Sequence, residues 1–278
     1  MFMPNGFNQK IIDEFRANAG RVGGPFEGGR LLLLTTTGAR SGRSHTVPLG
    51  YLPDGDRVLI IGSANGAARH PGWFHNVQAD PRVTVEVGPF SYEGRAEVLE
   101  KADRDAMFAR AVEFQPRWAD YQNGNPRVLP VVAVHQVAGG PPKASSMGAA
   151  LILVHDAFRL ELTRIRREVA SSGPGLVAQL RVNCLTLCQG LAVHHTGEDN
   201  AVFPMLARRY PELEPVRRRL GQEHERIAAL MAELRAAVSA DRDDVAAVAA
   251  DVDRLVTELE AHLRYEEEQL VPALDGLL

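Results

Sequence analysis

Two segments in the second half of the sequence place a glutamate four residues after a histidine. His194 is followed by Glu198, and His262 is followed by Glu266. Both segments have helical periodicity, and residues four apart share one face of a helix. An imidazole and a carboxylate on the same face can bind one metal ion together. A proline follows each histidine by ten residues, so the two segments repeat one pattern.

The other histidines of this half extend the pattern. Five of the nine histidines lie beyond residue 149, in four segments with helical periodicity, and each segment holds at least one. His155 lies in the first segment and His224 in the third. Four helices of similar length joined by short turns predict an up-down four-helix bundle. The expected helices span residues 149–171, 175–209, 212–239 and 243–274.

A bundle core with a histidine from every helix and carboxylates on two helices has the ligands that a dinuclear metal site needs. Imidazole suits iron, and carboxylates can bridge two ions. The two cysteines, Cys184 and Cys188, provide too few thiolates for an iron–sulfur cluster, and we expect both to be small buried hydrophobic residues. Acidic residues near the histidines, such as Asp199 and Glu223, are expected mostly on the solvated surface of the helices.

The second half of the chain resembles a hemerythrin-like (HHE, cation-binding) domain, which implies a bundle that holds two iron ions. His194 is preferred over His195 because only His194 has the spacing to Pro204 that His262 has to Pro272. The metal ligands that the resemblance implies are His155, His194, Glu198, His224, His262 and Glu266.

Two positions depart from the pattern of the oxygen-carrying hemerythrins. Those proteins have a second histidine four residues after the histidine of the third helix, and here that position is Ala228. The resemblance then implies that one iron loses a nitrogen ligand, which argues for reactive chemistry or sensing over oxygen storage. The oxygen carriers also place the last carboxylate five residues after its histidine, at Glu267. Helix geometry favours Glu266, because four residues return to within about 40° of the starting face, and Glu267 stays an alternate.

The first half of the chain has a different pattern. Short apolar or alternating runs bounded by turn residues predict strands, and Asp54-Gly55-Asp56 is a hairpin turn. Several short strands with tight turns and one or two helices indicate a small β-barrel rather than alternating βαβ units. The expected strands span residues 31–37, 47–52, 57–62, 83–87, 94–99 and 129–137, and the expected helices span residues 8–18 and 101–114.

Two loops of this half have residues that suit a cofactor. In residues 35–43, two glycines let the backbone approach a ligand, while Arg40 and Arg43 add positive charge. This loop is either a phosphate cradle or a charged hairpin turn. In residues 62–76, glycines leave room for a flat ring, and amide groups can bond the polar edge of that ring.

These loops resemble the deazaflavin-dependent nitroreductase family, whose split β-barrel binds coenzyme F420, an 8-hydroxy-5-deazaflavin. The resemblance covers residues 7–137 and includes a Thr-Thr-Gly-x-Arg-Ser-Gly-Arg run and a His-Pro-x-Trp-x-x-Asn run. It implies that Arg40, Ser41 and Arg43 hold the phosphate and tail of the cofactor. The full set of implied cofactor-binding residues is Arg40, Ser41, Gly42, Arg43, Pro48, Ser63, Asn65, Gly66, Ala67, Trp73 and Asn76, and the implied substrate side is Tyr51, Trp118 and Tyr121.

The composition is that of a cytoplasmic protein with two domains. A net charge of −4 gives no reason to expect a nucleic-acid partner, and no apolar run reaches the roughly 18 residues of a membrane span. A stretch rich in proline, glycine and serine separates the two halves. We therefore expect an α+β chain with a split β-barrel of the FMN/F420-binding type at 1–138, a linker at 139–148 and an up-down four-helix bundle at 149–278.

The combined hypothesis is an F420H2-dependent oxidoreductase that reduces a quinone, a nitro compound or a similar electrophile. It is fused to a di-iron domain that binds or senses O2, peroxide, nitric oxide or iron. The expected partners are a small-molecule electron acceptor and one of these gases or peroxide, and a homodimer is left open. Two alternatives remain: a non-catalytic redox or oxygen sensor that uses both cofactors, and a reductase that uses FMN.

Overall fold

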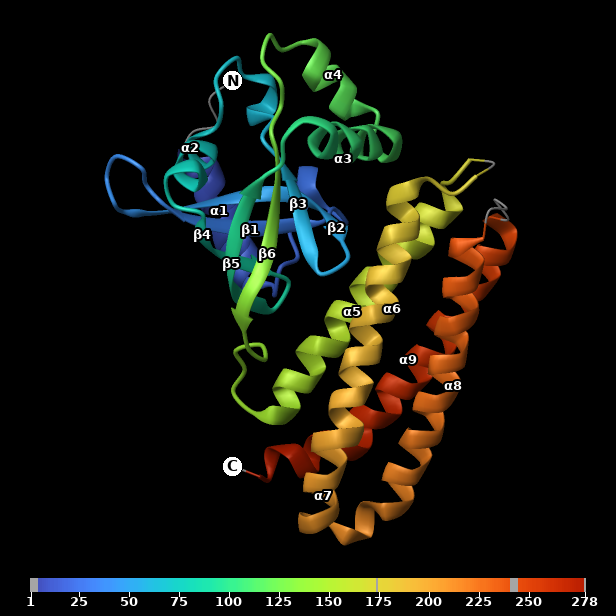
Figure 1. Ribbon diagram of the computed structural model, residues 1–278. Coiled ribbons are helices and arrows are strands. Elements are labelled where there is room, and N and C mark those ends of the chain that lie inside the picture. Colours follow the sequence, from blue (N-terminus) through green and yellow to red (C-terminus); the bar gives the residue numbers. More distant parts are fainter. Residues whose placement is uncertain (1–4, 174, 241–244, 278) are drawn as a thin grey trace. The chain divides into compact units, whose positions relative to one another are not determined.

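The computed structural model describes residues 5–173, 175–240 and 245–277, and the chain divides into two compact units, Met1–Pro141 and Pro142–Leu278 (Figure 1). The first unit is a β-barrel with small helices, and the second is a bundle of long helices. This arrangement confirms the predicted fold class. Among the described residues, no helix combines the length and the apolar character that crossing a membrane requires.

Six antiparallel strands close the barrel. They are β1 (Leu31–Thr37), β2 (Ser44–Asp54), β3 (Arg57–Ile61), β4 (Arg82–Val87), β5 (Phe90–Val98) and β6 (Val131–Gly139). Neighbouring strands pair in the order β1-β2-β3-β6-β5-β4, and β1 pairs with β4 to complete the ring. Closure of the ring gives every strand a neighbour on both sides, which reduces the strand edge open to edge-to-edge aggregation.

Strand β1 is buried on both faces, which explains its run of four leucines. Leu32 and Leu34 pack in the barrel interior. Leu31 and Leu33 point the other way and pack against the apolar face of helix α1 (Asn5–Ala17). Burial on both faces replaces the usual alternation of a strand with a continuous apolar run.

Three further helices flank the barrel: α2 (Gly72–Ala79), α3 (Lys101–Phe114) and α4 (Arg117–Asn123). The periodicity of residues 101–114 predicts α3, but α2 and α4 were not expected. They have only eight and seven residues, which is too few turns for an apolar stripe to show in the sequence. Both carry residues expected at the site: Trp73 and Asn76 on α2, and Trp118 and Tyr121 on α4.

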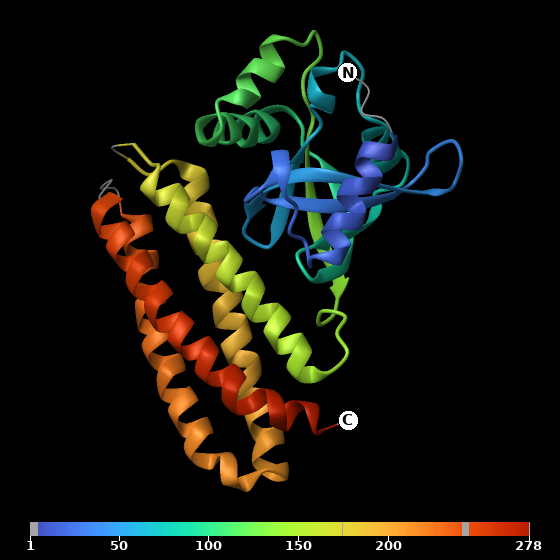
Figure 2. The same ribbon diagram turned by 180° about the vertical axis from the view of Figure 1, so that it is seen from behind.

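Four long helices form the second unit and run alternately up and down (Figures 1 and 2). They are α5 (Met147–Ala170), α6 (Ala178–Gly197), α8 (Glu214–Ser239) and α9 (Val245–Asp275). Helix α5 packs on α6 and α9, and α8 packs on the same two helices. The four predicted helices are therefore present, although the predicted start of the last one, residue 243, lies outside the described residues.

The second predicted helix, residues 175–209, is not one regular α-helix. After α6, a π-helical turn spans Glu198–Val202, and α7 (Phe203–Arg209) follows. Pro204 stands just after this turn, and a proline has no N–H to donate to the carbonyl four residues before it. Single π turns within helices are frequent at functional sites, and this one begins at a candidate metal ligand.

Two apolar clusters fill the bundle on either side of a polar layer. The larger cluster includes Cys184 and Cys188, which are fully buried, as predicted. The smaller cluster includes Phe203, Leu220 and Leu270. The predicted metal ligands lie between the two clusters along α6, α8 and α9, so the polar layer is enclosed by apolar packing.

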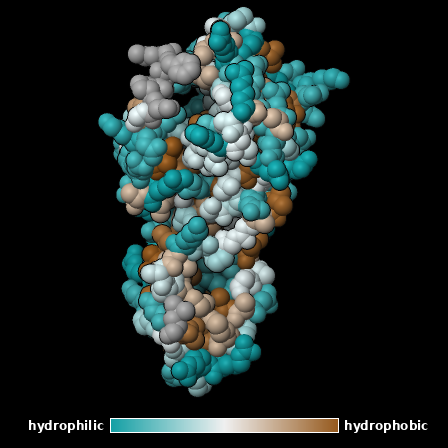
Figure 3. All heavy atoms as spheres, turned by 90° about the vertical axis from the view of Figure 1, so that its left-hand side faces the viewer, coloured by the Kyte–Doolittle hydropathy of each residue, from teal (hydrophilic) through white to brown (hydrophobic). Residues whose placement is uncertain are grey.

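Exposed hydrophobic side chains do not gather into one patch on the face of the molecule drawn in Figure 3. The exposed large apolar residues include Val128 and Val137 in the first unit and Val193 in the second. Apolar residues that are exposed singly are normal on protein surfaces and do not indicate a docking site.

Gly20 and Gly24 provide a matched test of how α1 is joined to the barrel. Both have a left-handed φ, but a Cβ at Gly20 would lie 2.5 Å from the Gly88 Cα, whereas nothing lies within 4 Å of one at Gly24. We expect Gly20→Ala to lower the free energy of unfolding by about 2–4 kcal/mol, from strain plus overpacking, and Gly24→Ala by about 1 kcal/mol, from strain alone. Tryptophan fluorescence in urea measures the barrel selectively, because Trp73 and Trp118 are the only tryptophans. Equal losses in the two variants would contradict the close contact.

Candidate functional site

The first group of candidate ligands lies between α5, α6 and α9. His155 Nε2 is 3.2 Å from His194 Nε2. Glu198 Oε1 is 3.3 Å from His194 Nε2, and Glu266 Oε2 is 3.5 Å from His155 Nε2. Each side chain offers one ligand atom to a set whose members all lie within 4.8 Å of one another. Such a set can surround a single metal ion.

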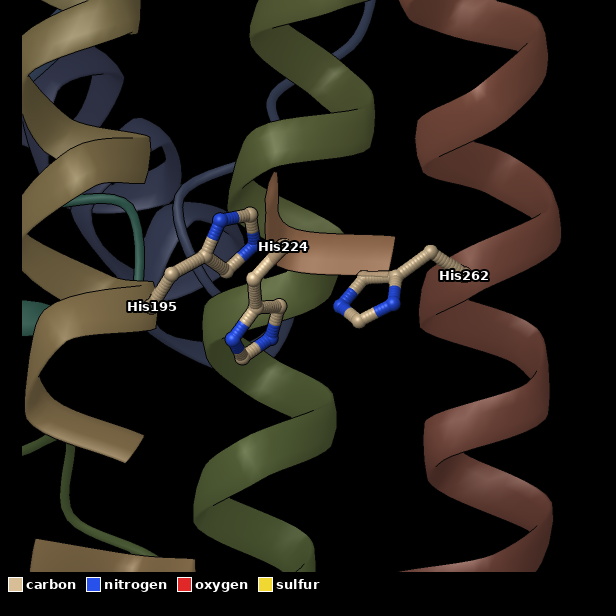
Figure 4. Close-up of side chains that lie close together, drawn as sticks. All are labelled: His195, His224 and His262. Atoms are coloured by element: carbon tan, nitrogen blue, oxygen red, sulfur yellow. The ribbon is translucent and has the colours of Figure 1, made fainter. Parts of the chain in front are cut away.

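The second group consists of three buried histidines from three helices, His195, His224 and His262 (Figure 4). Each contributes one ring nitrogen to a set that also lies within 4.8 Å. The rings of His195 and His224 stack with their centroids 4.2 Å apart, and both meet the ring of His262 edge-on. The convergence of three ring nitrogens forms a second position at which a metal can be held.

Two glutamates connect the groups. Glu198 has Oε1 near His194 in the first group and Oε2 3.6 Å from His224 Nε2 in the second. Glu266 Oε2 lies 3.5 Å from Nε2 of His155 and 3.5 Å from Nε2 of His262. Carboxylates that stand between two sets of imidazoles are placed to bridge two ions, as in di-iron carboxylate bundles.

Seven buried atoms of this layer have no hydrogen-bond partner within the described part of the chain. They are Nε2 of His195, His224 and His262 and both carboxylate oxygens of Glu198 and Glu266. Leaving a buried polar atom unpaired costs on the order of 1–3 kcal/mol. A cation at each position removes this cost, and imidazole and carboxylate ligands suit iron, so the residues fit a dinuclear iron centre.

Three of the histidines are held from outside by a carboxylate at Nδ1. The pairs are His155–Glu267 at 2.8 Å, His224–Asp199 at 2.9 Å and His262–Glu223 at 3.0 Å. A hydrogen bond at Nδ1 fixes the tautomer and leaves Nε2 as the ligand that faces inward. Asp199 is exposed, as expected, and still hydrogen-bonds His224, whereas Glu223 is buried rather than on the solvated surface.

Burial favours the uncharged form of three imidazoles of this layer. It lowers the pKa of His194 to about 3, that of His195 to about 2 and that of His262 to about 4. Burial also raises the pKa of Glu198 and of Glu266. Neutral imidazole is the form that binds metal. Because ionising a carboxylate in an apolar layer costs free energy, a nearby cation stabilises the charged form of Glu198 and Glu266 strongly.

The structure brings the six ligands expected from the sequence into one layer and places His195 beside them. The sequence argument treated His194 and His195 as alternatives, but both rings face the layer. Adjacent residues lie about 100° apart around a helix, so they can straddle the direction to the centre of the bundle. The signal that pointed to His195 was the histidine doublet itself. On α9, Glu266 is fully buried in the layer, whereas Glu267, the alternate ligand, hydrogen-bonds the outer nitrogen of His155.

In the barrel, residues 38–43 form a tight turn between β1 and β2. The Gly38 N–H donates to the Arg43 carbonyl, the Gly42 N–H donates to the Gly38 carbonyl, and Gly42 adopts a left-handed φ of 64°. The Ser41 hydroxyl accepts from the Arg43 N–H and lies 3.2 Å from His45 Nε2. The side chains of Arg40 and Arg43 are exposed, so the turn presents two guanidinium groups to an anionic ligand.

Asn76 on α2 holds the base of this turn. Its side chain donates to Thr36 Oγ1 at 2.9 Å and accepts from the Ala39 N–H at 3.0 Å. Both ends of the amide are therefore engaged by the protein. Trp73, from the same helix, is 6% exposed and packs in the barrel core. These contacts indicate that both residues shape the loops, although the resemblance implies direct contact with the deazaflavin.

The loop Ser63–Ala67 has three consecutive residues with left-handed φ, Ala64, Asn65 and Gly66. Two side chains hold it in place by binding its carbonyls. Asn125 Nδ2 donates to the carbonyls of Gly66 and Ala67, and Arg127 donates to those of Ser63 and Ala67. Strained backbone persists only where its surroundings enforce it, and such strain is frequent at ligand-binding sites.

The expected substrate-side residues are partly buried and lie on two elements. On α4, the rings of Trp118 and Tyr121 have their centroids 5.9 Å apart. A Cβ at Gly66 would be 3.6 Å from the Tyr121 ring, so Tyr121 lies beside the strained loop. Tyr51 is on β2, three residues after Pro48, and packs against the interior cluster of the barrel. The structure thus places Tyr121 next to an expected cofactor loop.

Comparison with known proteins assigns each half of the chain. The family model described as F420H2-dependent quinone reductase matches residues 9–136, and the hemerythrin HHE cation binding domain matches residues 147–274. Similar proteins include the putative F420H2-dependent quinone reductase Mb1292c of Mycobacterium bovis and the F420H2-dependent quinone reductase Rv1261c of Mycobacterium tuberculosis. Each is 36% identical over 126 residues, which are 43% of this chain and 83% of the relative.

Among solved structures, the chain is similar to one described as an F420-H2 dependent reductase (FDR-A). The two are 36% identical, the match covers 38% of this chain and 94% of that chain, and the TM-score is 0.36.

A six-stranded barrel with a glycine–arginine turn, followed by a four-helix bundle with a layer of imidazoles and carboxylates, defines a two-part redox protein. The chain belongs to the F420H2-dependent quinone reductase family, and it joins that domain to a hemerythrin HHE cation binding domain. The predicted fusion is therefore confirmed, as is the predicted enzyme class, an F420-dependent oxidoreductase.

Arg127 allows a test of the strained loop that needs no cofactor. Its guanidinium makes separate hydrogen bonds to two loop carbonyls and contacts His70 Nδ1, which a lysine ammonium cannot reproduce. We expect Arg127→Lys to speed amide hydrogen exchange in residues 63–67 by about 10-fold or more, equivalent to losing one or two hydrogen bonds. Exposed Arg69 is the matched control, and Arg69→Lys should leave this exchange unchanged. Equal exchange in the Arg127 and Arg69 variants would show that Arg127 does not hold the loop.

Proposed function

We propose that the barrel binds reduced coenzyme F420 and reduces a quinone, a nitro compound or a similar electrophile. Family membership carries this proposal, together with the activity for which two relatives are named, each 36% identical over 126 residues that make up 83% of its own length. Reduced coenzyme F420, when bound, supplies a hydride, and the protein supplies orientation and shielding from water.

In this proposal, two loops of the barrel bind different parts of the cofactor. The exposed guanidiniums of Arg40 and Arg43 hold the anionic tail, with Ser41 and Gly42 shaping the turn between them. The loop Ser63–Ala67, kept in its strained form by Asn125 and Arg127, lies along the deazaflavin. Pro48 is a further proposed contact to the cofactor, and Trp73 and Asn76 are proposed to support the loops that hold it. The proposed contacts to the acceptor are Tyr51, Trp118 and Tyr121.

For the bundle, we propose a centre of two iron ions that interacts with O2, peroxide or nitric oxide, or responds to iron itself. The observation that carries this proposal is the set of buried nitrogen and oxygen atoms that have no hydrogen-bond partner among the described residues and are enclosed by apolar clusters. The proposed ligands are His155, His194, Glu198, His224, His262 and Glu266. Hydrogen bonds from outside already orient three of the imidazoles, so little rearrangement accompanies binding.

The reductase proposal predicts that the purified chain oxidises F420H2 when a soluble naphthoquinone is added. Because each guanidinium contributes a charge-assisted contact to the anionic tail, Arg40→Ala and Arg43→Ala should each weaken cofactor binding by about 10-fold, and less at high salt. Exposed Arg82 pairs with Asp80 on another loop, so Arg82→Ala is the control. Loss of F420H2 absorbance measures turnover, and fluorescence titration measures binding. Tight binding of F420H2 without turnover would support the alternative that the chain is a non-catalytic sensor. FMN that co-purifies with the chain would support the alternative of an FMN-dependent reductase.

The metal proposal predicts about two irons per chain after expression in iron-replete medium, as in other di-iron carboxylate bundles. Glu198→Gln and Glu266→Gln should each reduce iron to about one per chain or less, because each removes a carboxylate shared by both groups. Glu225, next to His224 but exposed, provides the control, and Glu225→Gln should keep the full content. Elemental analysis measures the iron. A wild-type chain without any transition metal would refute the proposal.

A further inference from the structure

One nitrogen ligand of the oxygen-carrying hemerythrins has no counterpart at the corresponding position of this chain. The oxygen carriers take one nitrogen from the fourth residue after the histidine of the third helix, and here that residue is Ala228. In the structure, Ala228 is exposed, whereas His224 is buried. Position 228 of α8 therefore faces away from the layer, and the second group of ligands needs a nitrogen from another helix.

His195 lies where that nitrogen is needed. Its ring stacks on that of His224 and meets that of His262 edge-on, and its own ring nitrogen lies within 4.8 Å of theirs. The side chain is 5% exposed, and its Nε2 has no hydrogen-bond partner among the described residues. Packing alone does not account for this placement, because a leucine or phenylalanine would fill the same space without burying an unpaired nitrogen.

The orientation of α6 in the bundle explains how the adjacent residues His194 and His195 can each belong to a different group of ligands. His194 points toward His155 and has its Nε2 3.2 Å from that ring, while His195 points toward α8 and α9. Glu198, on the next turn, has one oxygen toward each side. The helix thus faces the boundary between the two groups, with one imidazole on either side of it.

We infer that His195 is a metal ligand and supplies the third nitrogen of the position formed with His224 and His262. This inference rests on the proposed two-iron centre and concerns which residues complete it. The centre then has five nitrogen ligands, two in one group and three in the other, with Glu198 and Glu266 between the groups. The absence of a histidine at 228 removes no ligand, so it no longer argues for reactive chemistry over oxygen storage.

The test is an anaerobic titration of the metal-free full-length chain with Co(II), whose visible absorption reports the number of nitrogen ligands, repeated with Fe(II). His195→Phe keeps an aromatic ring in the stack and removes only the nitrogens. His75→Phe makes the same substitution at an exposed position of the barrel and serves as the control. Circular dichroism of each apoprotein checks that the bundle is folded. If the His195→Phe variant does not fold, the His195→Gln variant is used in its place.

We expect the wild type and the His75 variant to bind about two metals per chain, and His195→Phe to bind the second at least about 10-fold more weakly, with altered Co(II) bands. In His195→Ala, added imidazole should restore the second metal by occupying the vacated space, which a packing role would not allow. Two metals with wild-type affinity and bands in His195→Phe would overturn the inference while leaving the two-metal proposal intact. One metal or none in the wild type would overturn both.

Discussion

The bundle depends on one constraint: Glu198 and Glu266 are buried among imidazoles, and water cannot solvate their charge. Their carboxylate oxygens have no hydrogen-bond donor within the described residues, and burial raises the pKa of both groups. The apolar clusters on either side must offset this cost in the metal-free protein. A cation converts the same feature from a cost into a source of stability, because binding free energy is then also folding free energy.

The geometry of the layer is maintained from outside as well as from within. Glu267 joins His155 to Arg159, and Glu223 joins His262 to Arg219. Each carboxylate thus carries a hydrogen bond to an imidazole and an ion pair to an arginine near the surface. Partial burial alone would raise the pKa of Glu267, but the hydrogen bond from His155 and the ion pair with Arg159 lower it to about 2. The imidazoles are consequently oriented before any metal arrives, which lowers the conformational cost of binding.

The sequence predicted the elements that carry strong periodicity and the ligands that repeat at helical spacing. The strands, α3 and the four long helices were found in this way, as was Cys184 in the apolar core. It could not predict α2 and α4, which are too short for a periodic signal. The placement of His195 in the layer was also missed, because spacing along one helix says nothing about the direction in which that helix faces its neighbours. The engagement of Asn76 by Thr36 depends on residues forty positions apart and appears only in three dimensions.

The two halves hold their candidate ligands by opposite means. In the barrel, exposed arginines and a backbone loop form the proposed cofactor-binding elements, and Asn125 and Arg127 stabilise the loop by binding its carbonyls. Contacts from the exposed arginines are screened by salt and open to water, which suits a cofactor that binds and dissociates during turnover. In the bundle, the ligands are side chains enclosed by apolar clusters, so an ion cannot leave without exposing unpaired nitrogen and oxygen atoms. The barrel is therefore built for exchange of its cofactor, and the bundle for retention of its metal.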